Sequence, residues 1–285
     1  MDTTKQETKE FEAFLSVLHA YPAHFTRAEK MLFLERIAIF FSKTGRSILL
    51  ERNGFFGIQN INLTAGHMKT ARYIIAASYD TPARNLFGGM QYRFPRISKV
   101  IFSLLPILFL LLIALVFINL LHWPLISAVL LVCPLYLFCV RFFGNRQNKN
   151  ASSGLVAAYL LMQQLPPNIC LVLCDHGYLG KLGLRSFLKT NKIKIPVLYL
   201  EALGVGQMQL LQATKAVAPQ ETPISARLTQ RLWQYRKYKL FCLSSVTPSP
   251  FGYYVPHIGT PRDTSMHLEQ IIDITNKIKE SLLPQ

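Results

Sequence analysis

The longest apolar stretch of the chain runs from residue 100 to residue 140, and no Asp, Glu, Lys or Arg occurs between Lys99 and Arg141. A straight helix of about 41 residues would be roughly 60 Å long, twice the thickness of the hydrocarbon core of a bilayer. We therefore predict two transmembrane helices that fold back at residues 122–124, where the sequence is His-Trp-Pro. Proline ends a helix, and tryptophan favours the membrane interface.

Basic residues on both sides of this hairpin predict its orientation. They are Arg93, Arg96 and Lys99 before it and Arg141, Arg146 and Lys149 after it, whereas the turn has no Lys or Arg. The positive-inside rule then predicts a two-helix protein of the cell membrane, with both termini and the soluble domain in the cytoplasm. Residues 125–140 are near the shortest length that spans a bilayer, so a re-entrant hairpin is an alternative. A buried helix pair of a soluble protein is disfavoured by the lack of charge.

Outside the hairpin, the hydrophobic pattern predicts helices that alternate with short strands. The helix at 26–43 begins with Thr26 and Glu29, the two residues of a capping box. Asn53-Gly54 predicts a tight turn between strands at 47–50 and 55–58. Continuous apolar runs predict buried strands at 73–77, 169–174 and 196–200. The other helices are predicted at 7–20, 151–165, 181–190, 225–237 and 264–282.

This alternation predicts an α/β fold of three layers, in which helices cover both faces of a mostly parallel mixed sheet. The predicted domain is single and discontinuous, formed by residues 1–99 and 143–285, with the hairpin at 100–140 inserted into it. The first 30 residues contain Asp2, Glu7, Glu10 and Glu12 and no continuous apolar stretch. We therefore expect no signal peptide, and the hairpin is expected to direct membrane insertion.

The chain carries a formal net charge of +16, which favours an anionic partner. With a membrane hairpin present, the bilayer surface is favoured over nucleic acid, for which no recognised binding module is found. The basic and aromatic segment at 225–237 could contact lipid headgroups or form a solvated helix face. Cys170, Cys174 and Cys242 lie in apolar, strand-like runs, which predicts buried reduced thiols.

Polar residues stand at the ends of the predicted strands. Asp80 follows one strand, Asp175 and His176 follow the next, and Glu201 follows the third. Ligand sites of open parallel sheets gather at the carboxyl ends of the strands. These residues are therefore the candidate site.

The serial order of five segments around these residues resembles the family-28 zinc metallopeptidases of clan MH. That group includes aminopeptidases, glutaminyl cyclases and the ectodomain of the transferrin receptor. The resemblance implies a phosphorylase/hydrolase-like zinc exopeptidase fold, and in the family two zinc ions activate a bridging water.

At the first zinc-ligand motif, His-x-Asp, this chain has Ser78, Tyr79 and Asp80, so the Asp is kept and the ligand is not. The second motif, Asp-Asn-Ala-Ser-Gly, supplies the bridging carboxylate. It resembles the segment that begins Lys149-Asn150-Ala151, where lysine stands in place of the bridging Asp. An ammonium group at that position would repel Zn²⁺.

The third family motif supplies the general base and a ligand from a Glu-Glu pair within a glycine frame. Here Asp175 and His176 precede Gly177 and Tyr178, which replace both glutamates. Glu201 matches the acidic ligand of the fourth motif and is the one plausible ligand that remains. At the fifth motif Gly259 replaces a histidine, ahead of Asp263.

The resemblance therefore implies the fold but argues against hydrolysis, because one of five ligands remains and the base is missing. We predict a catalytically inactive pseudopeptidase with no catalytic residue, no bound metal and no cofactor. It would act as a binding or scaffold subunit of a membrane assembly. One alternative is an active membrane-bound zinc aminopeptidase or related hydrolase with unconventional ligands, and another is a lipid-surface protein whose pocket has no role.

Two narrower alternatives concern single groups of residues. Asp175, His176, Glu201, His257 and His267 could form a rearranged metal site. Asp263 could instead be the N-cap of the last helix. The hairpin is inserted between Asp80 and Ala151, two positions that line the site in the family. We therefore expect the degenerate pocket to lie beside the bilayer and to meet another membrane protein or a membrane-proximal peptide.

Overall fold

The computed structural model describes residues 2–24, 26–55, 58–81, 115, 147–177, 181–213, 226–228, 235, 237–249, 252–258, 260 and 262–282. Apart from Leu115, the predicted hairpin at 100–140 lies outside the described residues. Within the described part of the chain, no helix is both long enough and apolar enough to cross a membrane. The hairpin and its orientation therefore stay predictions.

The described strands form one mixed sheet in the order β1-β2-β4-β3-β5-β8-β6-β7, and β9 pairs with β8. Neighbouring strands among β4, β3, β5 and β8 are parallel, whereas β1, β2 and β6 join the sheet in antiparallel pairs. The strands are β1 (Ile48–Phe55), β2 (Ile58–Ala65), β3 (Tyr73–Ser78), β4 (Ile169–Cys174), β5 (Val197–Leu200), β6 (Met208–Ala213), β7 (Ala226–Leu228), β8 (Leu240–Ser249) and β9 (Gly252–Tyr254).

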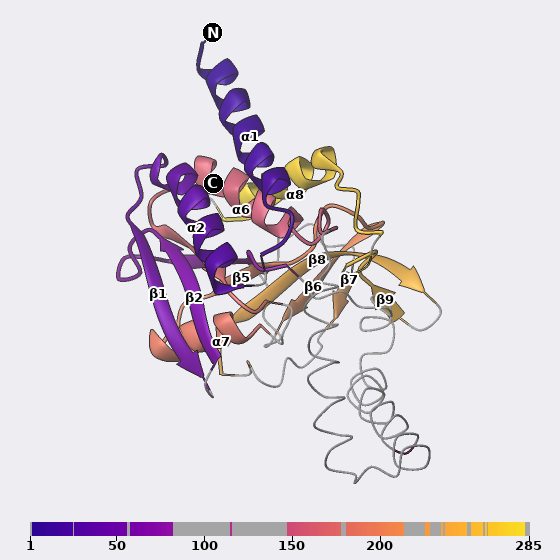
Figure 1. The fold of residues 1–285 in the computed structure, drawn as a ribbon. Coiled ribbons are helices and arrows are strands. Elements are labelled where there is room, and N and C mark those ends of the chain that lie inside the picture. Colours follow the sequence, from indigo (N-terminus) through magenta and orange to yellow (C-terminus); the bar gives the residue numbers. More distant parts are fainter. Residues whose placement is uncertain are drawn as a thin grey trace.

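Helices cover both faces of this sheet (Figure 1). One face is covered by α1 (Asp2–Ala20), α2 (Arg27–Ser42), α6 (Ser153–Gln164) and α8 (Leu268–Leu282). The opposite face is covered by α7 (Leu182–Thr190). The predicted three-layer arrangement around a mixed sheet is therefore confirmed, with parallel pairing among β4, β3, β5 and β8 and between β6 and β7.

The central strands explain why the core has two halves. Along β3, Ile75 and Ala77 pack on the side of α6, whereas Ile74 and Ala76 pack on the side of α7. Every residue of β4 is buried, as expected for a strand covered on both faces. Cys170, Cys174 and Cys242 are buried free cysteines. Burial raises the pKa of Cys170 and of Cys242 to about 12, which keeps both groups as thiols.

The boundaries of several predicted elements are confirmed. Helix α2 begins after Thr26, whose side chain accepts a hydrogen bond from the backbone of Glu29, and the Glu29 carboxylate in turn accepts from the backbone of Thr26. This is the predicted capping box. The strands predicted at 73–77, 169–174 and 196–200 match β3, β4 and β5 within one residue.

The turn predicted at Asn53-Gly54 is wrong. Both residues lie within β1, where Asn53 pairs with Asn60 and Gly54 with Gln59, and the register continues to the pair Phe55 and Ile58. The register follows the burial of Ile61 and Leu63 in β2, because a slip of one residue would move both side chains to the opposite face. The helix predicted at 225–237 is also wrong at its start, where β7 pairs with β6.

Candidate functional site

The predicted polar positions meet at one edge of the sheet. Strands β3, β4 and β5 are parallel neighbours, with Ser78 opposite Cys174 and Ala77 opposite Leu200. The residues that follow these strands, including Asp80 and Glu201, therefore lie along the same edge. The sequence prediction that these strand ends come together is confirmed.

Asp80 is held by the residues around it. Its Oδ1 accepts hydrogen bonds from the Ser78 hydroxyl and from the backbone N–H of Gly177, the latter at 2.9 Å. Burial raises the pKa of Asp80 to about 6, although Lys30 and the Ser78 hydroxyl favour the charged form. The carboxyl group is therefore half-protonated near pH 6. Its hydrogen bond from Gly177 holds the loop that follows β4.

Gly177 has no room for a side chain. A Cβ placed on it would lie 2.8 Å from the hydroxyl oxygen of Tyr199 and closer still to Oγ and Cβ of Ser78. Real Cβ atoms do not approach other heavy atoms so closely, so a side chain at 177 requires Ser78 and Tyr199 to move. Ser78 is buried and hydrogen-bonded, and Tyr199 is 1% exposed, so neither can move freely.

Glu201 forms an ion pair with Lys181. The Lys181 Nζ lies 2.6 Å from Glu201 Oε1, and the two side chains are 14% and 10% exposed. The same ammonium lies 4.6 Å from the centre of the Tyr199 ring, within the range of a cation–π contact. Burial lowers the pKa of Lys181, but the combined effects of Glu201, Cys242 and Asp80 outweigh it, and the pKa is raised overall. Lys181 is therefore a stable internal cation.

Asp175 is fully enclosed and has several partners. Its carboxylate forms an ion pair with Lys30 of α2, and side-chain exposures of 8% and 2% show that this pair is buried. The carboxylate also accepts hydrogen bonds from the backbone N–H groups of Ile61 and His176. The His176 ring contacts the Asn60 side-chain oxygen at 2.8 Å. These contacts tie β2, α2 and the end of β4 together.

The segment before α6 is fixed by Asp263. The Asp263 carboxylate accepts hydrogen bonds from the backbone N–H groups of Asn150, at 2.6 Å, and Ala151, at 3.4 Å. Asn150 itself is buried, and its side-chain oxygen accepts from the backbone of Gly204. Burial raises the pKa of Asp263 to about 7 despite these donors. Because α8 begins at Leu268, the prediction that Asp263 caps this helix is wrong.

Several solved structures share this arrangement over nearly their whole length. A Zn-dependent exopeptidase from Parabacteroides distasonis superposes with a TM-score of 0.61 at 12% identity, covering 97% of this chain and 98% of that one. A glutaminyl cyclase from Porphyromonas gingivalis gives 0.60 at 11% identity, covering 96% of each chain. A leucine aminopeptidase precursor from Bacteroides thetaiotaomicron gives 0.57 at 12% identity, covering 97% of each. This chain has the zinc-exopeptidase fold.

The predicted resemblance is thus confirmed for the fold, and identities this low establish the fold alone. No protein-family model matches the sequence, and neither does any curated protein.

The donor set at the described positions does not fit the two zinc ions of the zinc-exopeptidase fold. Ser78 stands where the first ligand is expected, the exposed Lys149 where the bridging carboxylate is expected, and Gly177 where the base is expected. Glu201 has a carboxylate, but Lys181 is bound to it. Tyr178 and Gly259 lie outside the described residues.

The rearranged metal site is not assembled either. In the part of the chain that the structure describes, no three His, Cys, Asp or Glu side chains lie close enough together to hold a metal ion. Asp175 is paired with Lys30, and His176 with Asn60. His257 and His267 are exposed residues of the segments that follow β9 and precede α8.

Sequence reasoning missed the two lysines that pair with the acidic residues. Lys30 did carry a signal, because it continues the stripe of buried positions Phe33, Leu34 and Ile37 on α2. A charged residue within an apolar stripe needs a buried partner. Lys181 carried no comparable signal, since its φ of 56° and its position just before α7 depend on the fold of the loop.

Proposed function

We propose that this protein is a membrane-anchored, metal-free member of the zinc-exopeptidase fold that acts as a binding or scaffold subunit of a membrane assembly. The proposal rests on the ion pairing and the packing of the strand-end site. Two of its carboxylates are paired with internal lysines, and the position expected for the general base has no space for a side chain.

The packing around Gly177 supports the loss of base catalysis. A glutamate at this position would have a Cβ in the same place, where it would overlap Ser78 and Tyr199. A general base must reach within hydrogen-bond distance of the water that it activates. The site would therefore have to rearrange before a carboxylate could act from residue 177.

The lysines support the loss of the metal. Zinc would have to displace Lys181 from Glu201, and lysine replaces the expected bridging carboxylate at residue 149. Removing one partner of a largely buried ion pair costs several kcal/mol, about 3–5 for fully buried pairs. Glu201, the single acidic ligand that remains, is thus already paired with a lysine of the same chain.

The membrane anchor is supported by the sequence of residues 100–140, which has no charged side chain and is flanked by basic residues. The apolar segment is inserted between β3 and α6, and the residues on both sides of it, Asp80 and Ala151, belong to the site. The site would then face the headgroup region, where a membrane protein or a membrane-proximal peptide could reach it.

Metal content tests the first part of the proposal. The full-length chain, purified in mild detergent and incubated with one equivalent of Zn²⁺ per chain, is expected to retain no stoichiometric zinc after desalting, by elemental analysis. It is also expected to hydrolyse no aminoacyl substrate. Retention of one or two zinc ions, together with hydrolysis that Glu201→Ala abolishes, would instead establish the active hydrolase.

Topology tests the anchor. In a background with Cys133 and Cys139 replaced by serine, a cysteine introduced at Thr8 should resist an impermeant thiol reagent in intact cells, and one introduced at His122 should react. Labelling at Thr8 would reverse the orientation. Protection at both positions would indicate a re-entrant hairpin, because the turn would not reach the far surface.

Crosslinking tests the scaffold role. A photo-crosslinker at the exposed Gln147, beside the site, should capture a membrane protein that also co-purifies with the untreated chain. The matched control at Asn276, on the exposed side of α8, should capture much less of it. Equal capture from both positions would remove the argument that the site faces the partner.

A further inference from the structure

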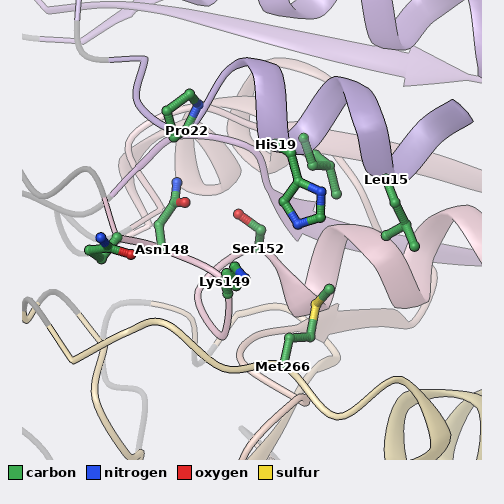
Figure 2. Close-up of a pocket in the computed structure, with 9 residues that line it drawn as sticks. Leu15, His19, Pro22, Asn148, Lys149, Ser152 and Met266 are labelled. Carbon is green, nitrogen blue, oxygen red and sulfur yellow. The ribbon is translucent and has the colours of Figure 1, made fainter. Parts of the chain in front are cut away.

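A cavity of about 290 Å³ lies between α1 and the segment that leads into α6. In Figure 2, Leu15 and His19 extend from α1 toward it, Met266 approaches from the opposite side, and Asn148, Lys149 and Ser152 lie between them. Its remaining lining residues are Leu18, Pro22 and Gln147. This volume is at the small end of the range of ligand pockets, roughly 300–1,000 Å³.

The polar side of the cavity has positive charge and hydrogen-bond donors. Lys149 makes no ion pair with any described residue, and no Asp or Glu is among the described residues that line the cavity. The Asn148 residue is 7% exposed, yet its side chain makes no hydrogen bond within the described part of the chain. Its amide atoms are not fully enclosed, so they can hydrogen-bond water or a ligand in the cavity.

The start of α6 adds to this character. Ser152 precedes the helix as its N-cap, but its hydroxyl makes no capping hydrogen bond and lines the cavity. The positive end of the helix dipole of α6, a helix of 12 residues, therefore faces the same space as Lys149. Together these groups favour a negatively charged ligand.

The other side of the cavity is apolar. Leu15 and Leu18 of α1, with Pro22 and Met266, offer hydrocarbon surface opposite the donors. Leu15 and Leu18 also pack against the main core, so this wall is held in place. A ligand that fills the cavity must therefore combine one anionic group with a short apolar part.

We propose that this cavity binds a small amphiphilic anion, with its carboxylate or phosphate at Lys149, Asn148 and Ser152 and its short hydrocarbon tail against Leu15 and Leu18. The site is separate from the strand-end carboxylates, and it requires neither the loss of zinc nor a protein partner. A negative result for this cavity would therefore leave the proposed function unaffected, and the reverse also holds.

Titration of hexanoate into the full-length chain in lipid nanodiscs, followed by isothermal titration calorimetry, tests the proposal. Hexanoate is expected to bind at one site per chain. Acetate should bind at least about tenfold more weakly, because each buried CH₂ contributes about 0.8 kcal/mol. Hexylamine, which carries the opposite charge, should not bind. Hexyl phosphate is compared with hexanoate, and the tighter of the two identifies the preferred headgroup.

Lys149→Gln should weaken binding of hexanoate about tenfold or more, because it removes the charge-assisted interaction. The matched control Lys194→Gln removes one positive charge from an exposed loop away from the cavity and should leave the affinity unchanged. The same fold loss in both variants would mean that only net charge is sensed. That result, equal binding of hexylamine, or binding of neither anion would overturn the proposal.

Discussion

Replacing Gly177 by alanine is expected to destabilise the folded protein by about 3 kcal/mol. The added Cβ would lie 2.8 Å from the Tyr199 hydroxyl and closer still to Ser78. Carbon atoms prefer a separation of roughly 3.5–4.0 Å. Overpacking of this kind costs about 1–3 kcal/mol, and moving Ser78 also breaks its hydrogen bond to Asp80, which is worth about 1 kcal/mol.

Thermal unfolding of the full-length chain in detergent measures this effect, with an expected fall in Tm of about 5–10 °C. A double-mutant cycle with Ser78→Gly identifies the cause. Ser78→Gly removes the hydroxymethyl group that the new Cβ would meet, so the double variant should be less destabilised than the sum of the two single variants. We expect a coupling of at least about 1 kcal/mol.

The result bears directly on catalysis, because glutamate at residue 177 requires the same space. Gly177→Glu alone is therefore expected to lower stability without producing hydrolysis. The reasoning is refuted if Gly177→Ala changes the free energy of unfolding by less than about 0.5 kcal/mol, or if the two single substitutions are additive. Either result would mean that the site can accept a side chain at this position.

Three further predictions concern charge and capping. The pKa of Asp80 is about 6 in the fold, above its ordinary value, so its contribution to stability is complete below about pH 4 and is lost as the pH rises through 6. The stability difference between wild type and Asp80→Asn should then fall by about 2 kcal/mol from pH 4 to 7.5 in urea titrations. Lys30→Met should cost about 3–5 kcal/mol by leaving Asp175 buried and unpaired, whereas Lys43→Met, at an exposed pair, should cost under about 1 kcal/mol. Thr26→Ala should cost about 1 kcal/mol in the same assay by removing the cap of α2.

Taking a difference between two chains is essential for the pH prediction, because another buried group acts in the opposite direction. Burial lowers the pKa of His24 to about 4, so its contribution to stability rises as the pH increases over much of the same range. His24 is present in both wild type and Asp80→Asn, and its effect cancels. A pH-independent difference would show that Asp80 titrates near its ordinary value.

The hydrophobic pattern predicted the central strands because β3, β4 and β5 are buried on both faces and therefore consist of continuous apolar runs. It failed where pairing with another strand decides the structure. Asn53-Gly54 has strong local turn chemistry, but the register of β1 and β2 places both residues within a strand. The short strand β7 exists through its pairing with β6, which local sequence does not encode.

In the candidate site, too, local sequence predicted some features, whereas others depend on how the chain folds. The order of Asp80, Asp175 and Glu201 along the chain was enough to predict that they share an edge, because parallel strands bring their carboxyl ends together. Their partners were not predictable in this way. Lys30 comes from a helix 145 residues before Asp175, and this pairing depends on how α2 packs against the sheet.

The two lysines also explain why restoring individual metal ligands should not restore a metal site. A buried carboxylate at this edge needs a nearby cation, which zinc provides in the metallopeptidases that the sequence resembles. Here Lys30 and Lys181 provide it, and each comes from an element with a structural role of its own, α2 and the residue before α7. Histidine at residue 78 and aspartate at residue 149 would add ligands, yet Glu201 would remain bound to Lys181. Under the proposed function, the metal-free state is therefore a property of the packing around the whole edge rather than of one missing ligand.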